Sequence, residues 1–156
     1  MKFVLESSFL TWNSIPVKTT ADTKDVVFVY SGEGQAKVDI DGNAHRFHLV
    51  CTGGEKFDAG ENYLDYLKGN YYDCYAHVNL RDADGDLIII NSGTIDNQDF
   101  IMRVAGGTGK WEGIKGKFDA KLTFVEVRKT EGNNPQNHYW CVYAFEGTGD
   151  VELTKA

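Results

Sequence analysis

Glu126 and Arg128 are the residues whose types and spacing most directly predict chemistry. They end the stretch 117–128, in which apolar and polar residues alternate as in a half-buried strand. The apolar set must face the core, and the same alternation then turns Glu126 and Arg128 inward at the far end of the strand. Buried charge is costly unless it is paired or wet, so an inward acid and base predict a water-accessible cavity mouth. The alternative is that the alternation breaks at the strand end and both groups are solvated.

A carboxylate kept dry in an aromatic pocket favours its protonated form and can exchange a proton with a bound molecule. Glu126 is the candidate acid or base, with Arg128 or Arg103 as the partner for an anion, and Tyr72 or Tyr143 as a hydrogen-bond donor. No metal ligand is assigned and no cofactor is expected. The candidate site comprises the catalytic residues Glu126, Arg128 and Tyr72 and the substrate-binding residues Tyr143, Trp140, Phe124, Cys74, Asn91, Arg103 and His138.

Two motifs resemble ligand-binding loops but fail the spacing that such loops need. The segment 106–111 (GGTGKW) resembles a phosphate loop, yet Val104 stands where the first glycine is required and Trp111 where Ser or Thr is required. The segment 82–86 (DADGD) resembles a calcium loop, but Gly93 stands where the bidentate glutamate is required. A hairpin turn is therefore the favoured interpretation of 82–86.

The elements that must position these residues are almost all strands separated by Gly, Asn and Asp turns. Only 62–68 (NYLDYLK) could form a short helix. The predicted strands are 2–10, 25–31, 35–40, 44–51, 71–81, 86–91, 100–105, 117–128 and 138–145, the last of which can continue to 153.

About eight or nine strands in one domain, 1–156, suit a meander closed into a single antiparallel all-β barrel, because closure removes exposed edges. A two-sheet sandwich is the rival. Antiparallel order sets the short turns at one rim and the longer links at the other. Because long loops more often carry function, the second rim is the predicted mouth. The short connections are 41–43, 83–85 and 106–116, and the long ones are 52–70, 92–99 and 129–137.

The composition narrows the class of partner. The formal net charge of −7 disfavours nucleic acid and anionic membranes. No run of 18 apolar residues is present and Glu6 interrupts the apolar N-terminus, so we expect a soluble, cytoplasmic protein. The odd number of cysteines (Cys51, Cys74 and Cys141) indicates reduced thiols in a reducing compartment.

The glycine-rich segment 105–122 resembles a corner found in barrels of the allene oxide cyclase/dirigent superfamily, with Gly106, Gly107, Gly109, Gly113 and Gly116 at the matching positions. The closing stretch 143–153 and the hairpin 82–88 look similar to bacterial barrels of this kind. The resemblance covers roughly residues 70–154 and implies a lipocalin-like shape with a cavity. It carries over no catalytic residue.

The resemblance implies a cofactor-free enzyme, such as a cyclase, isomerase or lyase, acting on a small, largely hydrophobic molecule through shape and exclusion of water. A non-catalytic barrel that binds a small molecule is the alternative. A third hypothesis is a fully packed barrel that acts through its surface, which leaves a homo-oligomer open as a partner.

Overall fold

The computed structural model describes residues 1–13, 17–18, 25–58, 71–92, 99–129 and 139–154. Within these ranges the chain is almost entirely β-strand, with one 3-10 turn at Gly109–Trp111. The predicted helix at 62–68 lies outside the described residues. The strands are β1 (Lys2–Asn13), β2 (Val17–Lys18), β3 (Asp25–Ile40), β4 (Asn43–Asp58), β5 (Tyr71–Arg81), β6 (Leu87–Ser92), β7 (Asp99–Gly107), β8 (Ile114–Lys129) and β9 (Tyr139–Leu153).

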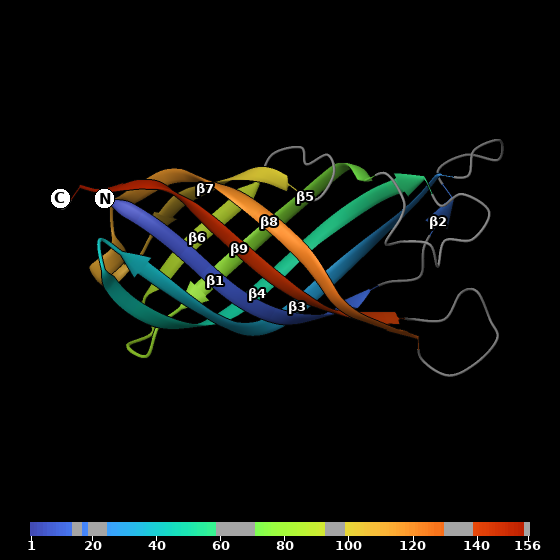
Figure 1. Cartoon of the computed structure of the whole chain (residues 1–156), viewed down its shortest axis with the longest axis horizontal. Coiled ribbons are helices and arrows are strands. Elements are labelled where there is room, and N and C mark those ends of the chain that lie inside the picture. Colours follow the sequence, from blue (N-terminus) through green and yellow to red (C-terminus); the bar gives the residue numbers. More distant parts are fainter. Residues whose placement is uncertain (14–16, 19–24, 59–70, 93–98, 130–138, 155–156) are drawn as a thin grey trace.

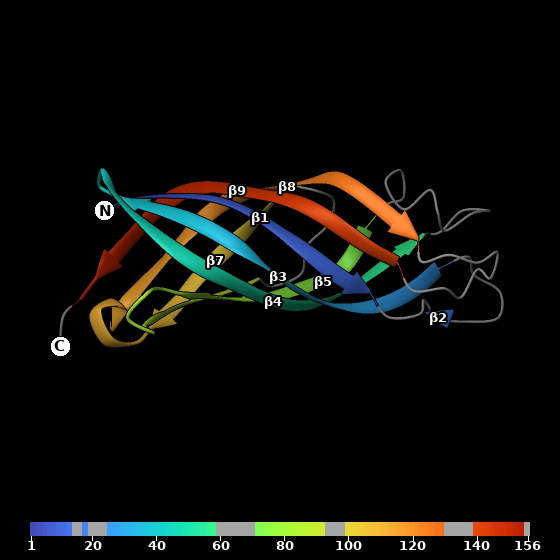
Figure 2. The ribbon, with the colours of Figure 1, turned by 90° about the horizontal axis from the view of Figure 1, so that it is seen from below.

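Eight of these strands close into an antiparallel barrel (Figures 1 and 2). The sheet order is β1-β9-β8-β7-β6-β5-β4-β3, and β1 pairs with β3 to complete the ring, while the short β2 extends the far end of β3. The closing ladder is continuous from Phe3↔Ile40 to Asn13↔Tyr30. The predicted closed barrel is therefore confirmed, and the sandwich alternative is wrong because no sheet edge opens between β1 and β3.

The sequence prediction of a break at Gly32-Glu33-Gly34 is wrong, since β3 runs through this segment without interruption. Its glycines allow the neighbouring strand β1 to pack closely and do not form a turn. Gly34 pairs with Phe9 across β1, and a Cβ on Gly34 would collide with the Phe9 backbone and side chain. A glycine within a strand often marks such a close approach of a neighbour.

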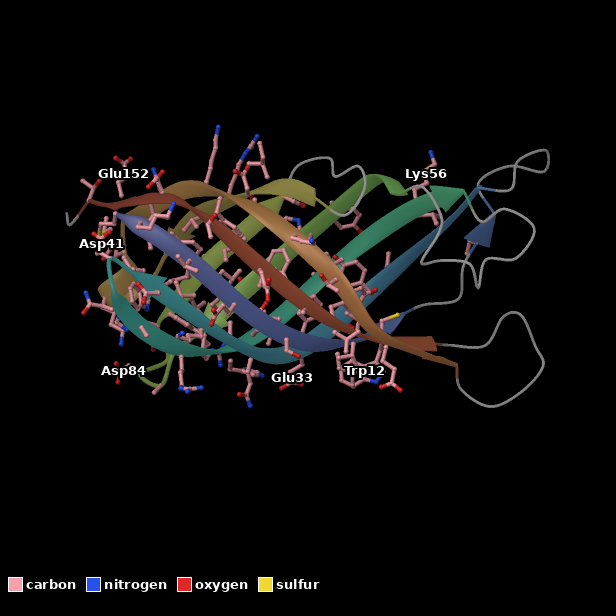
Figure 3. The ribbon with its side chains drawn as sticks, in the orientation of Figure 1. Trp12, Glu33, Asp41, Lys56, Asp84 and Glu152 are labelled. Atoms are coloured by element: carbon pink, nitrogen blue, oxygen red, sulfur yellow. The ribbon has the colours of Figure 1, made fainter. Side chains whose placement is uncertain are left out.

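The two rims are arranged as the loop lengths predict. One rim carries both termini, the Asp41-Gly42 hairpin and the turn at 82–86 (Figure 1). Asp41 and Gly42 have φ of 50° and 85°, the conformation of a tight turn whose twist matches the strands. Figure 3 places Asp41, Asp84 and Glu152 toward this rim and Trp12 and Lys56 toward the opposite one.

The glycine-rich corner covers the barrel at the rim that carries the termini. Trp111 is buried at 5% exposure, packs edge-on against His45 with ring centroids 4.9 Å apart, and lies 5.7 Å from the ring of Phe47. Its indole N–H donates to Asp82 Oδ2 at 2.9 Å. Gly109 has φ of +54°, and a side chain there would collide with the Asp86 carboxylate. The corner is thus a packed closure of the barrel and needs its glycines for that purpose.

The turn 82–86 is held by the ammonium group of Lys110. Lys110 Nζ lies 2.8 Å from Asp82 Oδ2 and 2.7 Å from Asp84 Oδ2. Backbone N–H groups of Asp84 and Asp86 donate to Asp82 Oδ1 at 2.9 and 3.0 Å. Among the described residues, no group of three or more His, Cys, Asp or Glu side chains could hold a metal ion. The hairpin interpretation therefore fits the geometry.

These contacts make Asp82 a source of acid sensitivity. Burial raises the pKa of its carboxyl group, but hydrogen bonds from Lys110, Trp111 and the backbone outweigh burial and lower the pKa from 3.8 to about 2. The stabilisation is therefore complete above about pH 4 and is lost as the pH falls through about 2. We expect Asp82→Asn to lower the free energy of unfolding at pH 6. The difference in this free energy between wild type and the variant should shrink between pH 4 and pH 2, as measured by urea denaturation. Asp84→Asn, at an exposed carboxylate, is the control, and its free energy of unfolding should differ less from that of wild type at every pH.

The interior near the terminal rim is a dry apolar core. Its side chains come from all eight strands of the ring, and each is essentially inaccessible to solvent. We call this region the closed half. Its largest fully buried members are Phe3, Leu5, Val38, Leu49, Leu80, Ile88, Ile90, Met102, Ile114 and Phe118.

Candidate functional site

The interior toward the opposite rim is lined differently from the closed half. Phe9, Tyr30 and Leu122 face inward, yet each remains partly exposed to solvent. Their orientation is fixed by contacts inside the ring. Phe9 stacks on Tyr143 at 5.3 Å, the Tyr30 ring lies against Gly53, and Leu122 pairs with the buried Phe145.

Partial exposure of an inward side chain in a closed barrel means that solvent reaches the interior there. Along β1 the inward residues Phe3 and Leu5 are 0% exposed, whereas Phe9 on the same face is not fully covered. The next inward residue of β1, Thr11, is buried again at 1%, so the exposure at Phe9 is local to that level of the barrel. We call the region bounded by Phe9, Tyr30, Ala76, Leu122 and Tyr143 the open half.

A row of small and polar residues crosses the open half on four adjacent strands. In register, Cys141 on β9 pairs with Thr11 on β1, Thr11 with Gly32 on β3, and Gly32 with Cys51 on β4. Thr11, Cys51 and Cys141 are buried, at 1%, 4% and 0% exposure. The Cys51 Sγ and the Thr11 methyl both lie 2.9 Å from the position that a Gly32 Cβ would take. Gly32 therefore lets the Cys51 thiol and the Thr11 methyl group approach each other.

The setting of Cys51 favours the protonated form of its thiol. Burial raises the pKa of its thiol from 9.0 to about 12, and a backbone hydrogen bond with Gly32 opposes this only in part. The thiol is therefore protonated at neutral pH, and the thiolate is the species that reacts.

Cys51 should react slowly in the folded protein. At pH 8, a shift of the pKa from 9.0 to about 12 lowers the thiolate fraction about a thousandfold. Cys51 is labelled with iodoacetamide and the product is located by peptide mapping. At the same pH, labelling should be at least about a hundredfold slower in buffer than in 8 M urea. Equal labelling rates in the two conditions would contradict this burial.

Glu126 does not point inward, contrary to the prediction from alternation. A β-bulge interrupts the β8–β9 pairing between Phe124 and Glu126, so that Glu126 is opposite Val142 and not opposite an inward residue. Both Val125 and Glu126 are exposed, as expected where a bulge places two residues against one. The alternation breaks near the strand end, which was the alternative interpretation.

Asn91 and Arg103 also lie on the outer face of the barrel. They are register partners on β6 and β7, and Arg103 is exposed between Met102 and Val104, which are buried at 0% and 2%. Strict alternation therefore directs their side chains away from the interior. The prediction placed Asn91 at the rim of the longer links and assigned both residues to substrate binding, but it did not assign their face.

Tyr143 is the predicted site residue that the structure places inside the open half, at 3% exposure. The side chains of six other predicted site residues lie outside the described part of the chain, and their roles remain predictions. These residues are Tyr72, Cys74, Phe124, Arg128, Trp140 and His138.

Sequence reasoning missed Phe9, Thr11, Tyr30, Cys51 and Ala76 as lining residues. A signal for β1 was available, because Phe3, Leu5, Ser7, Phe9 and Thr11 alternate inward along the whole strand. Ending the predicted strand at residue 10 removed Thr11 from consideration. For Tyr30 the predicted break at 32–34 hid the continuous alternation of β3.

A shallow groove of about 480 Å³ also lies on the outer surface, over β7, β8 and β9. It is open to solvent and is separated from the interior by the sheet itself. Its lining includes the exposed side chains of Ile101, Asp119, Lys121, Glu146 and Thr148. We do not assign it the function of the open half, because it lacks the enclosure that a small ligand needs.

No helix in the described residues is long and apolar enough to span a membrane.

Two solved structures are similar to the chain. A pyocyanin demethylase is 15% identical, with a TM-score of 0.36, over 88% of this chain and 98% of its own. A pterocarpan synthase dirigent protein is 12% identical, with a TM-score of 0.38, over 99% of this chain and 90% of its own. No family model and no curated protein matches the sequence. At these values the likeness carries no argument about activity, and the barrel assignment rests on the strand pairing itself.

Proposed function

We propose that this protein is a barrel that binds a small, largely hydrophobic molecule in its open half. The observation that carries the proposal is the partial exposure of the inward-facing Phe9, Tyr30 and Leu122, in contrast to the fully buried closed half. Apolar and aromatic walls with a few polar groups are typical of small-molecule sites.

The asymmetry of the two halves supports this proposal. Trp111 and the fully buried side chains of the closed half supply a rigid base. The open half contributes rings stacked on each other, such as Phe9 on Tyr143, and small residues such as Gly32, Gly53 and Ala76. Gly32 and Gly53 leave room for the Cys51 thiol and the Tyr30 ring to pack at this level, and a lining of aromatic and small side chains suits a small apolar ligand.

Native mass spectrometry of protein purified without stripping tests the proposal. We expect a mass increment of a small molecule that is released on denaturation and extracts into organic solvent. An apoprotein mass alone, together with failure to bind any member of a panel of neutral aromatic probes, would contradict it.

A catalytic form of this proposal is a cofactor-free cyclase, isomerase or lyase with Glu126, Arg128 and Tyr72 as the reacting groups. The outward position of Glu126 favours binding over chemistry that depends on this residue. The test is product analysis of the co-purified ligand after incubation with wild type and Glu126→Gln. Conversion by wild type that Glu126→Gln abolishes, with ligand retention unchanged, would support the catalytic form. Retention without conversion would contradict it.

A further inference from the structure

Thr11 carries a buried hydroxyl group for which the fold provides no partner. Thr11 is 1% exposed, and its Oγ1 is the buried side-chain polar atom in the described part of the chain that lacks a hydrogen bond. Buried hydroxyl groups are normally satisfied, so each exception calls for a physical reason.

Other polar side chains of the interior are satisfied by the fold. The Ser7 hydroxyl donates to the carbonyl of Phe145 at 2.7 Å. Ser92 Oγ accepts from the Ala76 N–H at 2.8 Å. The Thr11 hydroxyl group thus differs from those of Ser7 and Ser92, which form hydrogen bonds with backbone groups.

The described residues paired with or adjacent to Thr11 are glycine and cysteines, and none of them is an Asp, Glu, Lys or Arg. Its register partners are Gly32 and Cys141, and the Cys51 thiol lies across Gly32. Phe9, two residues along the same face of β1, is partly exposed, so the open half reaches the edge of this cluster. An ionised ligand group at this position would lose its hydration without meeting an opposite charge among the described residues, which is unfavourable. A neutral carbonyl or hydroxyl oxygen loses far less hydration free energy when it is buried there.

From this arrangement we propose that Thr11 is the polar anchor of the open half, whose hydroxyl group hydrogen-bonds a neutral oxygen, a carbonyl or hydroxyl, of an otherwise apolar ligand. The inference rests on the proposed function and specifies its ligand class. It excludes fatty acids and other carboxylates as preferred ligands and favours ketones, aldehydes, phenols or alcohols with an apolar body.

Three naphthalene probes of matched size test the inference: 2-acetylnaphthalene with a neutral carbonyl, 2-ethylnaphthalene without oxygen, and 2-naphthoate with a carboxylate. Binding is followed by titration calorimetry. Wild type should bind the ketone about tenfold more tightly than the hydrocarbon, as expected for one net hydrogen bond, and the carboxylate most weakly.

Thr11→Val keeps the shape of the side chain and removes the hydroxyl group. We expect it to lose the preference for the ketone while its affinity for 2-ethylnaphthalene stays within about twofold of wild type. Thr11→Ser should retain the preference. Thr123→Val, the same substitution at an exposed threonine of β8, is the matched control and should leave all three affinities unchanged.

Stability supplies a second readout that a merely structural threonine would not give. Removing an unsatisfied buried hydroxyl should leave the urea midpoint of Thr11→Val equal to or above that of wild type. Failure of Thr11→Val to fold, or a ketone preference unchanged by Thr11→Val, would overturn the inference and leave the proposed function standing. Failure of all three probes to bind wild type would instead overturn the proposed function.

Discussion

Phe118→Ala should lower the free energy of unfolding by about 3–5 kcal/mol, the range typical of removing a fully buried phenylalanine. Phe118 is 1% exposed and lies in the closed half, with ring centroids 5.2 Å from Phe3 and 6.3 Å from Phe145. Neighbours on all sides cannot collapse into the vacated space, because they belong to strands of a closed ring. Urea denaturation followed by tryptophan fluorescence measures the loss.

Leu122→Ala provides the comparison on the same strand and the same face. Leu122 is partly exposed, so its truncation removes less buried surface, and we expect a loss of about 1–2 kcal/mol. Equal losses for the two variants would contradict the division of the interior into a closed half and an open half.

Ala76→Phe should reduce ligand affinity at least about a hundredfold with little loss of stability. Ala76 faces inward and pairs with Gly53, against which the Tyr30 ring lies, so a larger side chain there would occupy the open half. Adding bulk to a well-packed core usually costs about 1–3 kcal/mol. If the open half is the ligand site that we propose, it should accept a phenyl ring at a smaller cost in stability.

His77→Phe introduces the same ring on the outer face of the same strand, where His77 is exposed. It should change neither the affinity for 2-acetylnaphthalene nor the stability by a measurable amount. If Ala76→Phe instead unfolds the protein while His77→Phe does not, the open half is already packed and the third hypothesis, a barrel that acts through its surface, gains support.

The fold could be predicted because its signals are local and repeated along the chain. Alternation in 117–128 and the Asp41-Gly42 turn each restrict their own segment, and together they leave few topologies other than a closed meander. The error at Gly32 and Gly34 has a physical cause. A glycine that allows a neighbouring strand to approach closely has the same sequence signature as a glycine that ends a strand, and only the partner strand distinguishes them.

The candidate site was harder to predict than the fold. One inserted residue at the β8 bulge moves Glu126 from the interior face to the exterior. The row formed by Cys141, Thr11, Gly32 and Cys51 joins four segments far apart in sequence. No spacing rule within one segment could indicate it, because it depends on the register of three strand pairs.

Intermolecular NOEs between bound 2-acetylnaphthalene and the isotope-labelled protein would show whether a small apolar molecule occupies the open half. We expect NOEs from the probe to the Leu122 methyl groups and the Phe9 ring, with none to Val38 or Ile88 in the closed half. NOEs confined to Ile101 would instead place the probe in the outer groove of β7, β8 and β9, and the open half would then not be the binding site.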